Sequence, residues 1–182
     1  MTSPGSLGDR ERARIFVGLP LPPDVVEPLA RWQQGELRGR IVARENLHVT
    51  LAFLGGRPVG ELGAIAAELR AAAAAAERPV LSVRGYRETR SVGMLVLEDL
   101  DGRAAALADD LHGRLERLGV YRREARRWLP HLTVLRFRER PRLRPALPDL
   151  GELTPSEAAV YHSLLRPGGA RYDVLESAAL GG

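Results

Sequence analysis

Short runs of aliphatic, β-branched and aromatic residues recur along the chain, bounded by glycine, proline or charged residues. Such runs, about four to eight residues long, are typical of β-strands. They predict strands over residues 14–20, 41–43, 47–54, 80–83, 92–97, 128–137, 158–165 and 172–175. Gly55 and Gly56 are expected to end the third strand, and the Arg- and Pro-rich residues 138–148 to form a loop.

Three segments between these runs have helical patterns, and helices are expected over residues 23–37, 60–77 and 101–118. The second contains six consecutive alanines, the residue that favours a helix most strongly. Asp101 is expected to cap the start of the third helix and Gly119 to stop it. This order of strands and helices favours an α+β fold of mainly antiparallel sheets backed by helices.

The chain has 182 residues, of which 45% are hydrophobic and 27% charged, enough for one domain with a buried core. Residues 1–13 lack the apolar segment of a signal peptide and are expected to form a flexible tail before a single domain over 14–182. No run approaches the roughly 20 apolar residues that cross a bilayer. We therefore expect a cytoplasmic protein without membrane contact, and a monomer.

Cysteine and lysine are both absent, so all 27 basic side chains are arginines. Without cysteine the chain has no disulfide, thiolate metal site or cysteine nucleophile. Without lysine it has no Schiff base, no P-loop lysine and no covalent lysine–nucleotide intermediate. The formal charge of +4 combines +8 over residues 114–144 (eleven Arg, three acids) with −4 elsewhere (sixteen Arg, twenty acids). The positive segment suits an anionic partner, although solvated surface accounts for most of its arginines individually.

Two tripeptides, His48-Val49-Thr50 and His131-Leu132-Thr133, lie within predicted strands. Residues i and i+2 of a strand project from one face, so each histidine shares a face with its threonine. Imidazole transfers protons near neutral pH, and a hydroxyl can bond a phosphate oxygen. Two such strands facing each other across a groove would form a site with two acid–base groups and two hydroxyls.

The other histidines fit structural roles better. His112 lies in the third predicted helix and His162 in a predicted strand, and both are expected to be exposed or half-buried. A metal site built on His48 and His131 lacks the HxH, HExxH or carboxylate spacing of metal ligands, so we expect none.

The segments HVTL and HLTV, 83 residues apart, resemble the duplicated HxTx signature of the 2H phosphoesterase superfamily. RIFVGLPLP, NLHVTLAFLG, PHLTVLRF and VYHSLLRPGGARYDVL resemble, in the same order, segments of bacterial RNA 2′,3′-cyclic phosphodiesterases, also called 2′-5′ RNA ligases. The resemblance extends from residue 14 to about residue 180. It implies a bilobal fold, with two pseudo-symmetric antiparallel sheets lining a central cleft and helices outside.

The resemblance also implies an activity: opening of a 2′,3′-cyclic phosphate, at an RNA end or in a cyclic nucleotide, to a 2′-phosphate without metal or cofactor. His48 would be the proton donor to the departing 3′ oxygen, and His131 the proton acceptor that activates water. The near symmetry of the motifs leaves these two roles exchangeable. Thr50, Thr133 and Arg136 would bind the phosphate.

Arg136 and Phe53 each lie five residues after a motif histidine. Strand alternation puts Arg136 on the opposite face from that histidine unless the strand bends. Phe53 is either a nucleobase contact or a core residue. Tyr161 and Tyr172, which resemble family positions near the cleft, are expected to have packing roles. Met94 stands where relatives often carry Trp, which changes any base contact made there.

Three functions fit these residues. The first is hydrolysis of the cyclic phosphate, and the second is the same site run in reverse, as a 2′-5′ RNA ligase. Because the chain has no lysine, joining would draw on the strained cyclic phosphate and not on ATP. The third is a non-catalytic RNA-binding module. A pure binder gains nothing from two paired proton-transfer groups, so hydrolysis is the favoured interpretation.

Overall fold

The computed structural model describes residues 11–181, so the tail expected over residues 1–13 lies outside this range up to residue 10, whereas its residues 12 and 13 belong to the first strand. The strands are β1 (Arg12–Pro20), β2 (Arg40–Ile41), β3 (His48–Pro58), β4 (Leu81–Glu88), β5 (Val92–Asp99), β6 (His131–Arg136), β7 (Glu157–Arg166) and β8 (Gly169–Ala179). The helices are α1 (Pro23–Glu36), α2 (Leu62–Ala75) and α3 (Arg103–Arg117), with short 3-10 turns η2 (Arg44–Asn46) and η3 (Val59–Glu61). Each predicted strand and helix has a counterpart, which confirms the α+β interpretation.

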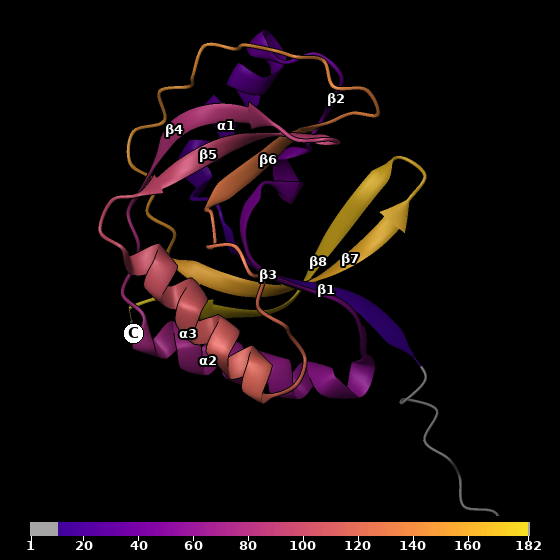
Figure 1. Cartoon of the computed structure of the whole chain (residues 1–182), viewed down its shortest axis with the longest axis vertical. Helices are drawn as coiled ribbons and strands as arrows, with labels where there is room; N and C mark the ends of the chain where they lie inside the picture. The colour runs from indigo at the N-terminus through magenta and orange to yellow at the C-terminus, as the bar shows by residue number, and fades with distance from the viewer. Residues whose placement is uncertain (1–10, 182) are drawn as a thin grey trace, which may run out of the picture.

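The strands form one antiparallel sheet in the order β4-β5-β6-β3-β1-β7-β8, with β2 also paired to β6. We refer to β4, β5, β6 and β2 as the β6 half, and to β3, β1, β7 and β8 as the β3 half. A single pair, Val49 with Leu132, joins the two halves, and Figure 1 shows them diverging from this junction. The two expected sheets are thus two halves of a continuous sheet.

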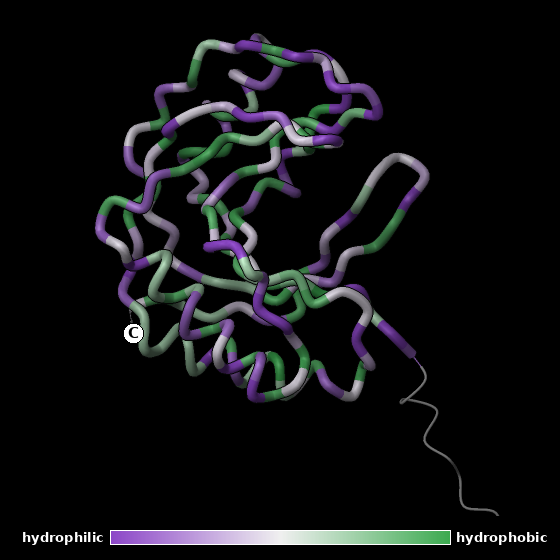
Figure 2. Tube along the Cα trace, in the orientation of Figure 1, coloured by the Kyte–Doolittle hydropathy of each residue, from purple (hydrophilic) through white to green (hydrophobic). Residues whose placement is uncertain are grey.

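Helices cover the outer faces of both halves. α2 and α3 lie side by side against the β3 half, and α1 lies behind the β6 half (Figure 1). Leu29, Leu69 and Leu111, one from each helix, are fully buried with Leu51 and Leu132 of the sheet; burial of such a side chain stabilises the fold by roughly 1.5–3 kcal/mol. Figure 2 shows hydrophobic and hydrophilic positions alternating along these elements. No helix within residues 11–181 has the length and hydropathy needed to span a membrane.

Two predicted boundaries are wrong. β3 does not end at Gly55 but continues to Pro58, because Gly55 adopts φ +68° and stays paired with Ile15 across a register shift. The N-cap of α3 is Gly102 and not Asp101. The Asp101 carboxylate still accepts a hydrogen bond from the N–H of Arg103, at 3.0 Å. Gly119, at φ +78°, follows the last residues of the helix as predicted.

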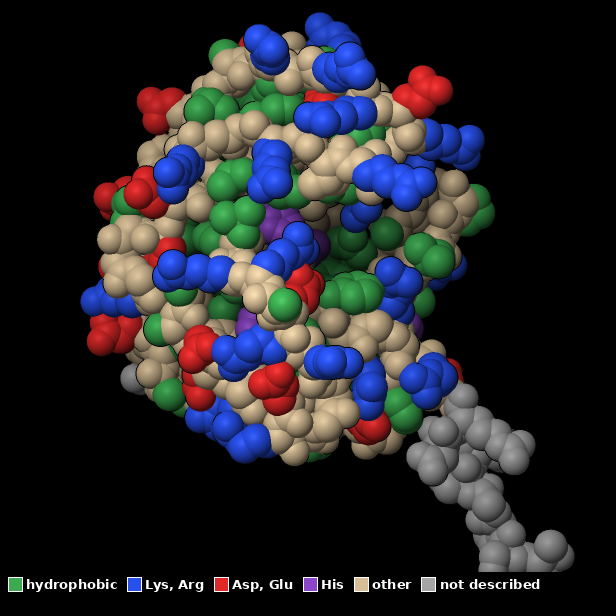
Figure 3. Space-filling view, viewed as in Figure 1, with side chains coloured by type: hydrophobic (Ala, Val, Ile, Leu, Met, Phe, Trp, Pro, Cys, Tyr) green, Lys and Arg blue, Asp and Glu red, His purple; other side chains and the backbone are tan. Residues whose placement is uncertain are grey.

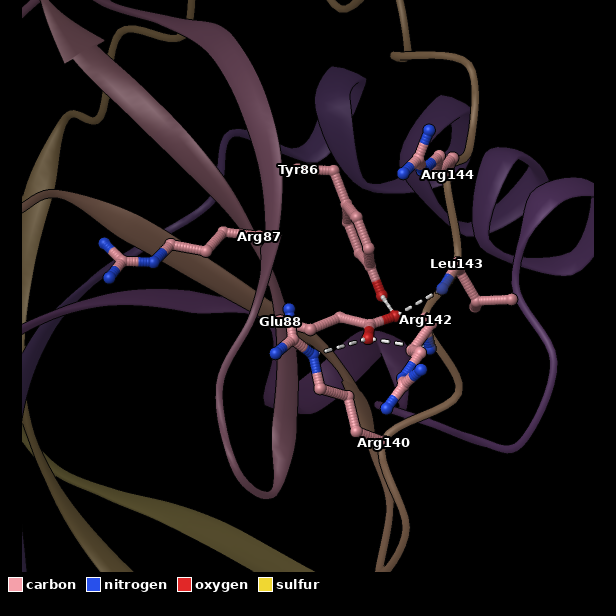
Figure 4. A pocket seen from close by; sticks show the side chains of 7 residues that line it. All are labelled: Tyr86, Arg87, Glu88, Arg140, Arg142, Leu143 and Arg144. Carbon is pink, nitrogen blue, oxygen red and sulfur yellow. Dashed lines mark hydrogen bonds and ion pairs between the residues drawn. The ribbon is translucent and has the colours of Figure 1, made fainter.

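The loop over residues 138–148 has no regular structure, as predicted, and is anchored by a buried carboxylate. Glu88 accepts hydrogen bonds from the backbone N–H groups of Arg142 and Leu143, at 2.9 and 2.8 Å. Figure 4 shows Tyr86 and Glu88 facing the loop from β4 while Arg87 points to the other side of the strand. A cavity of about 420 Å³ lies between β4 and this loop, lined by residues 86–88, 140 and 142–144.

Candidate active site

His48 and His131 begin adjacent antiparallel strands at the junction of the two halves. The junction pair, Val49 with Leu132, is fully buried on the outer face of the sheet. Because residues that flank an antiparallel pair face each other in reverse order, each histidine lies beside the threonine of the other strand. The predicted four-residue polar cluster therefore forms between neighbouring strands of one sheet, on what we call the histidine face.

The four motif side chains are half-buried. Figure 3 shows a hollow in the middle of the molecule, with a histidine side chain inside it and arginine side chains around it. Within residues 11–181, no group of three or more His, Asp or Glu side chains is placed to hold a metal ion. The groups available here for chemistry are imidazoles, hydroxyls and guanidinium groups.

Both motif strands contain a bulge of one residue at the same place. Leu51 has no partner in the pairing of β1 with β3, and Val134 has none in the pairing of β5 with β6. Each bulge residue lies three positions after its histidine and reverses the alternation of faces beyond it. Without the bulges, Phe53 and Arg136 would point to the outer, helix-covered face of the sheet. With them, both side chains share the histidine face. The bulge at Val134 is the strand bend that Arg136 needs in order to share a face with His131.

A buried polar side chain from a helix holds each bulge. His112 of α3 donates from Nε2 to the carbonyl of Leu51 at 2.7 Å, and Gln33 of α1 donates from Nε2 to the carbonyl of Val134 at 2.9 Å. Gln33 and His112 are only 1% and 5% exposed. The structural role predicted for His112 is confirmed, but its expected exposure is wrong, because the ring reaches through the core to the bulge.

The two motif histidines are oriented by hydrogen bonds of the same kind. Nδ1 of His48 lies 2.8 Å from the carbonyl oxygen of Asn46, and Nδ1 of His131 lies 2.9 Å from that of Leu129. A carbonyl only accepts, so Nδ1–H donates in both rings and Nε2 carries the lone pair of the neutral form. In His48 that Nε2 lies 2.9 Å from the Thr50 hydroxyl, which donates to it. In both rings Nε2 is therefore the nitrogen that is not bonded to the backbone.

Aromatic rings enclose His48. Its ring stacks on Phe16 with centroids 4.7 Å apart, and Tyr172 meets it edge-on at 5.4 Å. Tyr161 also stacks on Phe16, at 4.8 Å, and its ring lies 5.9 Å from that of His48. This confirms the packing role predicted for the two tyrosines. The pKa of His48 is lowered from 6.5 to about 4, chiefly by burial. The hydrogen bond to the Asn46 carbonyl opposes this shift, and the nearby charges of His131 and Arg136 contribute to it. His48 is therefore neutral at pH 7 in the free protein.

Gly18 of β1 makes room for the His48 ring. A Cβ atom on Gly18 would lie 3.1 Å from Cδ2 of His48 and 2.9 Å from the carbonyl oxygen of Val49. Both distances are shorter than ordinary contacts between these atoms, so a side chain here would displace the ring or the strand. Gly18 is thus a residue of the site that the HxT motifs do not indicate. A lone glycine inside an apolar strand, in RIFVGLP, is the signal that indicates such a close approach.

Asn46 is a second residue that the motif search missed. Its backbone carbonyl orients His48, and its side chain donates from Nδ2 to the carbonyl of Ala170 at 2.7 Å. Ala170 lies in β8, which also carries Tyr172 against the His48 ring. Asn46 therefore ties the start of β3 to the β7–β8 hairpin. No spacing in the sequence indicates this link, because the two residues meet only in the folded chain.

The remaining predicted residues flank the cluster. Phe53 is 50% exposed on the histidine face, so it is not a core residue, and the Arg14 guanidinium lies 4.8 Å from its ring centroid. Met94 pairs with Thr133 across β5 and β6 and is buried beside it. Arg136 is exposed beyond Thr133, and His162 is half-buried.

The positive segment over residues 114–144 is partly neutralised. Arg114, Arg123, Arg126 and Arg140 form ion pairs with acidic side chains. These are four of the eleven arginines, so seven form no ion pair with any residue of the described range 11–181. The unpaired arginines include Arg136, which lies on the histidine face next to the cluster.

The chain matches the 2′-5′ RNA ligase superfamily over residues 21–165 and belongs to this superfamily of 2H phosphoesterases. It is similar to an RNA 2′,3′-cyclic phosphodiesterase of Methanocaldococcus jannaschii, with 24% identity over 173 residues that cover 90% of this chain and 98% of the relative.

Solved structures share the fold. E. coli LigT complexed with 3′-AMP superposes with a TM-score of 0.78 at 26% identity, covering 94% of this chain and 100% of LigT. TT0787 of Thermus thermophilus superposes with a TM-score of 0.80 at 30% identity, covering 93% and 98%. These matches confirm the bilobal 2H phosphoesterase fold that the sequence resemblance implied.

Proposed function

We propose that the protein hydrolyses 2′,3′-cyclic phosphate ends of RNA to 2′-phosphates, as a monomer and without a metal. One observation carries the proposal: two histidines on adjacent strands, each held at Nδ1 by the carbonyl two residues before it, present Nε2 to one face. Ring opening needs one proton removed from water and one delivered to the departing oxygen, roughly in line across phosphorus. Two imidazoles that present Nε2 to the same face meet that need.

In this mechanism His48 is the proton donor to the 3′ oxygen and His131 is the proton acceptor from water. Thr50, Thr133 and Arg136 bind the non-bridging oxygens, the hydroxyls as donors and the guanidinium as a charged fork. The carbonyl at each Nδ1–H stabilises the imidazolium that forms when Nε2 takes a proton.

The low pKa of His48 couples its protonation to substrate binding. In the free protein His48 is neutral at pH 7, because its pKa is about 4. An anionic phosphate within about 4–6 Å favours the protonated ring and raises the pKa by roughly 1–3 units. The phosphate also offsets the charge of Arg136, which lowers the pKa of His48 in the free protein. His48 therefore becomes a donor only when the substrate is in place.

The relatives support a nucleotide substrate. One is named as an RNA 2′,3′-cyclic phosphodiesterase, and LigT has been solved with 3′-AMP. In this chain Phe53 is half-exposed on the histidine face, with the Arg14 guanidinium over its ring. We assign Phe53 to the nucleobase, since an exposed aromatic ring stacks on any base.

Ligation by the same site is the second candidate, because the superfamily is named for 2′-5′ RNA ligases. Ligation joins a 5′-hydroxyl, in place of water, to the cyclic phosphate. The bond from phosphorus to the 3′ oxygen breaks as in hydrolysis, so His131 takes the proton of the 5′-hydroxyl and His48 again protonates the 3′ oxygen. Since the chain contains no lysine, no covalent lysine–nucleotide intermediate can form, and joining must proceed without ATP.

The test is phosphate-end analysis of an oligonucleotide 2′,3′-cyclic phosphate incubated with the protein and EDTA. Hydrolysis leaves a 2′-phosphate, and this is the expected product. RNA halves with a cyclic phosphate and a 5′-hydroxyl, incubated without ATP, give a joined product if ligation dominates. Binding with a steep salt dependence and no product would instead identify an RNA-binding module and contradict the proposal.

A further inference from the structure

Arg40 and Arg136 lie directly opposite each other, an arrangement of like charges that does not stabilise the fold. They are direct partners on β2 and β6, and both are exposed. Directly opposite residues of an antiparallel pair share a face, and like charges in that position destabilise the sheet. Within residues 11–181, neither guanidinium forms an ion pair with a carboxylate. An anion bound between them would remove this repulsion.

The pair lies at one end of the histidine cluster. Arg136 follows Thr133 by three residues, which is about 7–10 Å along a strand that contains a bulge. The bulge at Val134 returns Arg136 to the histidine face, and pairing brings Arg40 to the same face. Because the two motif strands run in opposite directions, Phe53 lies beyond the other end of the cluster. The arginine pair and the exposed aromatic ring thus flank the histidines on opposite sides.

We propose that Arg40 and Arg136 bind the backbone phosphate that precedes the cyclic end, so that the site prefers an RNA chain to a free cyclic nucleotide. This inference rests on the proposed function, and it identifies the chain end as the substrate. A guanidinium fork matches two phosphate oxygens, and a pair of forks can hold one phosphodiester from both sides. With the last base at Phe53, the rest of the chain leaves the site past β2.

Arg40 is the residue that isolates this contact. Arg136 lies between the two phosphate positions and contributes to both. Arg40 belongs to a two-residue strand that pairs with the same edge of β6 as β3. Arg136, and not Arg40, is among the charges that lower the pKa of His48, so Arg40 lies farther from the cluster. Arg40 is therefore expected to contact only the preceding phosphate. A nucleoside 2′,3′-cyclic phosphate has no such phosphate, so Arg40 affects only substrates that extend by at least one nucleotide.

The experiment compares kcat/KM for a nucleoside 2′,3′-cyclic phosphate and for a dinucleotide that ends in the same cyclic nucleotide. We expect the wild type to prefer the dinucleotide and Arg40→Ala to reduce that preference roughly tenfold, the effect of one charge-assisted contact. Activity on the mononucleotide should stay within about twofold, since Arg40 does not reach the cyclic phosphate. Arg40→Lys keeps the charge and should retain part of the preference.

Salt dependence gives a second readout on the same proteins. Each phosphate contact on a single strand steepens the dependence of log affinity on log salt by about 0.7. The wild type should therefore show a steeper slope on the dinucleotide than on the mononucleotide, and Arg40→Ala should reduce the difference. Arg31→Ala is the matched control, because Arg31 is an exposed arginine on α1, behind the β6 half.

Each outcome decides the matter. A selective loss on the dinucleotide in Arg40→Ala, absent in Arg31→Ala, supports the inference. An unchanged preference, or an equal loss on both substrates in a variant with the wild-type melting temperature, overturns it and leaves the proposed function intact. If the wild type turns over neither substrate, the proposed function fails and the inference fails with it.

Discussion

Phe53 and Arg136 occupy equivalent positions, each five residues after the histidine of its strand and each returned to the histidine face by a one-residue bulge. The two strands repeat one backbone arrangement, down to the helix side chain that bonds the carbonyl of the bulge residue. The two strands differ in the side chain that lies five residues after the histidine, which is an aromatic ring in β3 and a guanidinium in β6. The site is symmetric in its backbone and asymmetric in its recognition groups.

The bulge contacts can be tested with Gln33→Leu. This change removes the side-chain donor to the carbonyls of Val42 and Val134, and the Val134 carbonyl keeps only the N–H of Val42. We expect a loss of about 1–3 kcal/mol in the free energy of unfolding, measured by urea denaturation. Because Arg136 depends on the bulge, kcat/KM should fall by roughly tenfold or more. Gln34→Leu, at an exposed position of the same helix, is the control. Equal stability and activity in the two variants would show that the bond does not hold the bulge.

Gly18→Ala tests the space beside His48. The added Cβ would lie 2.9 Å from the Val49 carbonyl and 3.1 Å from the His48 ring, so strand and ring must shift. We expect activity to fall by roughly tenfold or more and the free energy of unfolding by about 1–3 kcal/mol. Gly85→Ala, in β4, is the matched control, because an added Cβ there meets nothing within 4 Å. Full activity in Gly18→Ala would mean that the ring position is not critical.

The pKa of His48 makes stability depend on pH. Its pKa is about 4 in the folded protein and 6.5 when solvated, so the unfolded chain binds more protons between these values. The free energy of unfolding should therefore fall as the pH drops from 6.5 to 4, by about 3 kcal/mol from this group. His48→Gln should lack that component in urea titrations at pH 7, 5.5 and 4. Parallel losses in both proteins would contradict the low pKa.

Phe53→Ala tests the nucleobase contact. Stacking on an aromatic ring is worth about 1–3 kcal/mol per base, so KM for a cyclic nucleotide should rise roughly fivefold or more with little change in kcat. The melting temperature should stay close to that of the wild type, because Phe53 is 50% exposed. Leu165→Ala, at a position that is 80% exposed in β7, is the control. An unchanged KM would show that Phe53 does not contact the nucleobase.

The sequence was sufficient for the elements and for the motif histidines, because strand and helix periods and the HxT spacing are local patterns. The bulges could not be predicted. Leu51 is followed by Ala52, and Val134 by Leu135, and all four are apolar and buried. An extra residue in such a run does not change the hydrophobic pattern. Strand alternation alone therefore puts Arg136 on the opposite face from His131 unless the strand bends, and only the family resemblance implied its contact with the phosphate.

Residues that act through partners distant in the chain were also beyond sequence reasoning. Asn46 bonds Ala170, and Gln33 bonds Val134, across 124 and 101 residues. Their roles depend on which backbone carbonyl lies opposite them in the fold, and composition does not specify that. The sequence does not indicate that His112 bonds the carbonyl of Leu51 either, since a histidine on a helix face fits many surroundings.

The central claim is that two histidines hydrolyse the cyclic phosphate without a metal. Its most direct test is the turnover rate on an RNA 2′,3′-cyclic phosphate, in EDTA, for the wild type, His48→Ala and His131→Ala. We expect the wild type to release the 2′-phosphate and each variant, folded by circular dichroism, to be slower by roughly 10²–10⁴-fold. Turnover at the wild-type rate in either folded variant would contradict the claim, and so would loss of wild-type turnover in EDTA.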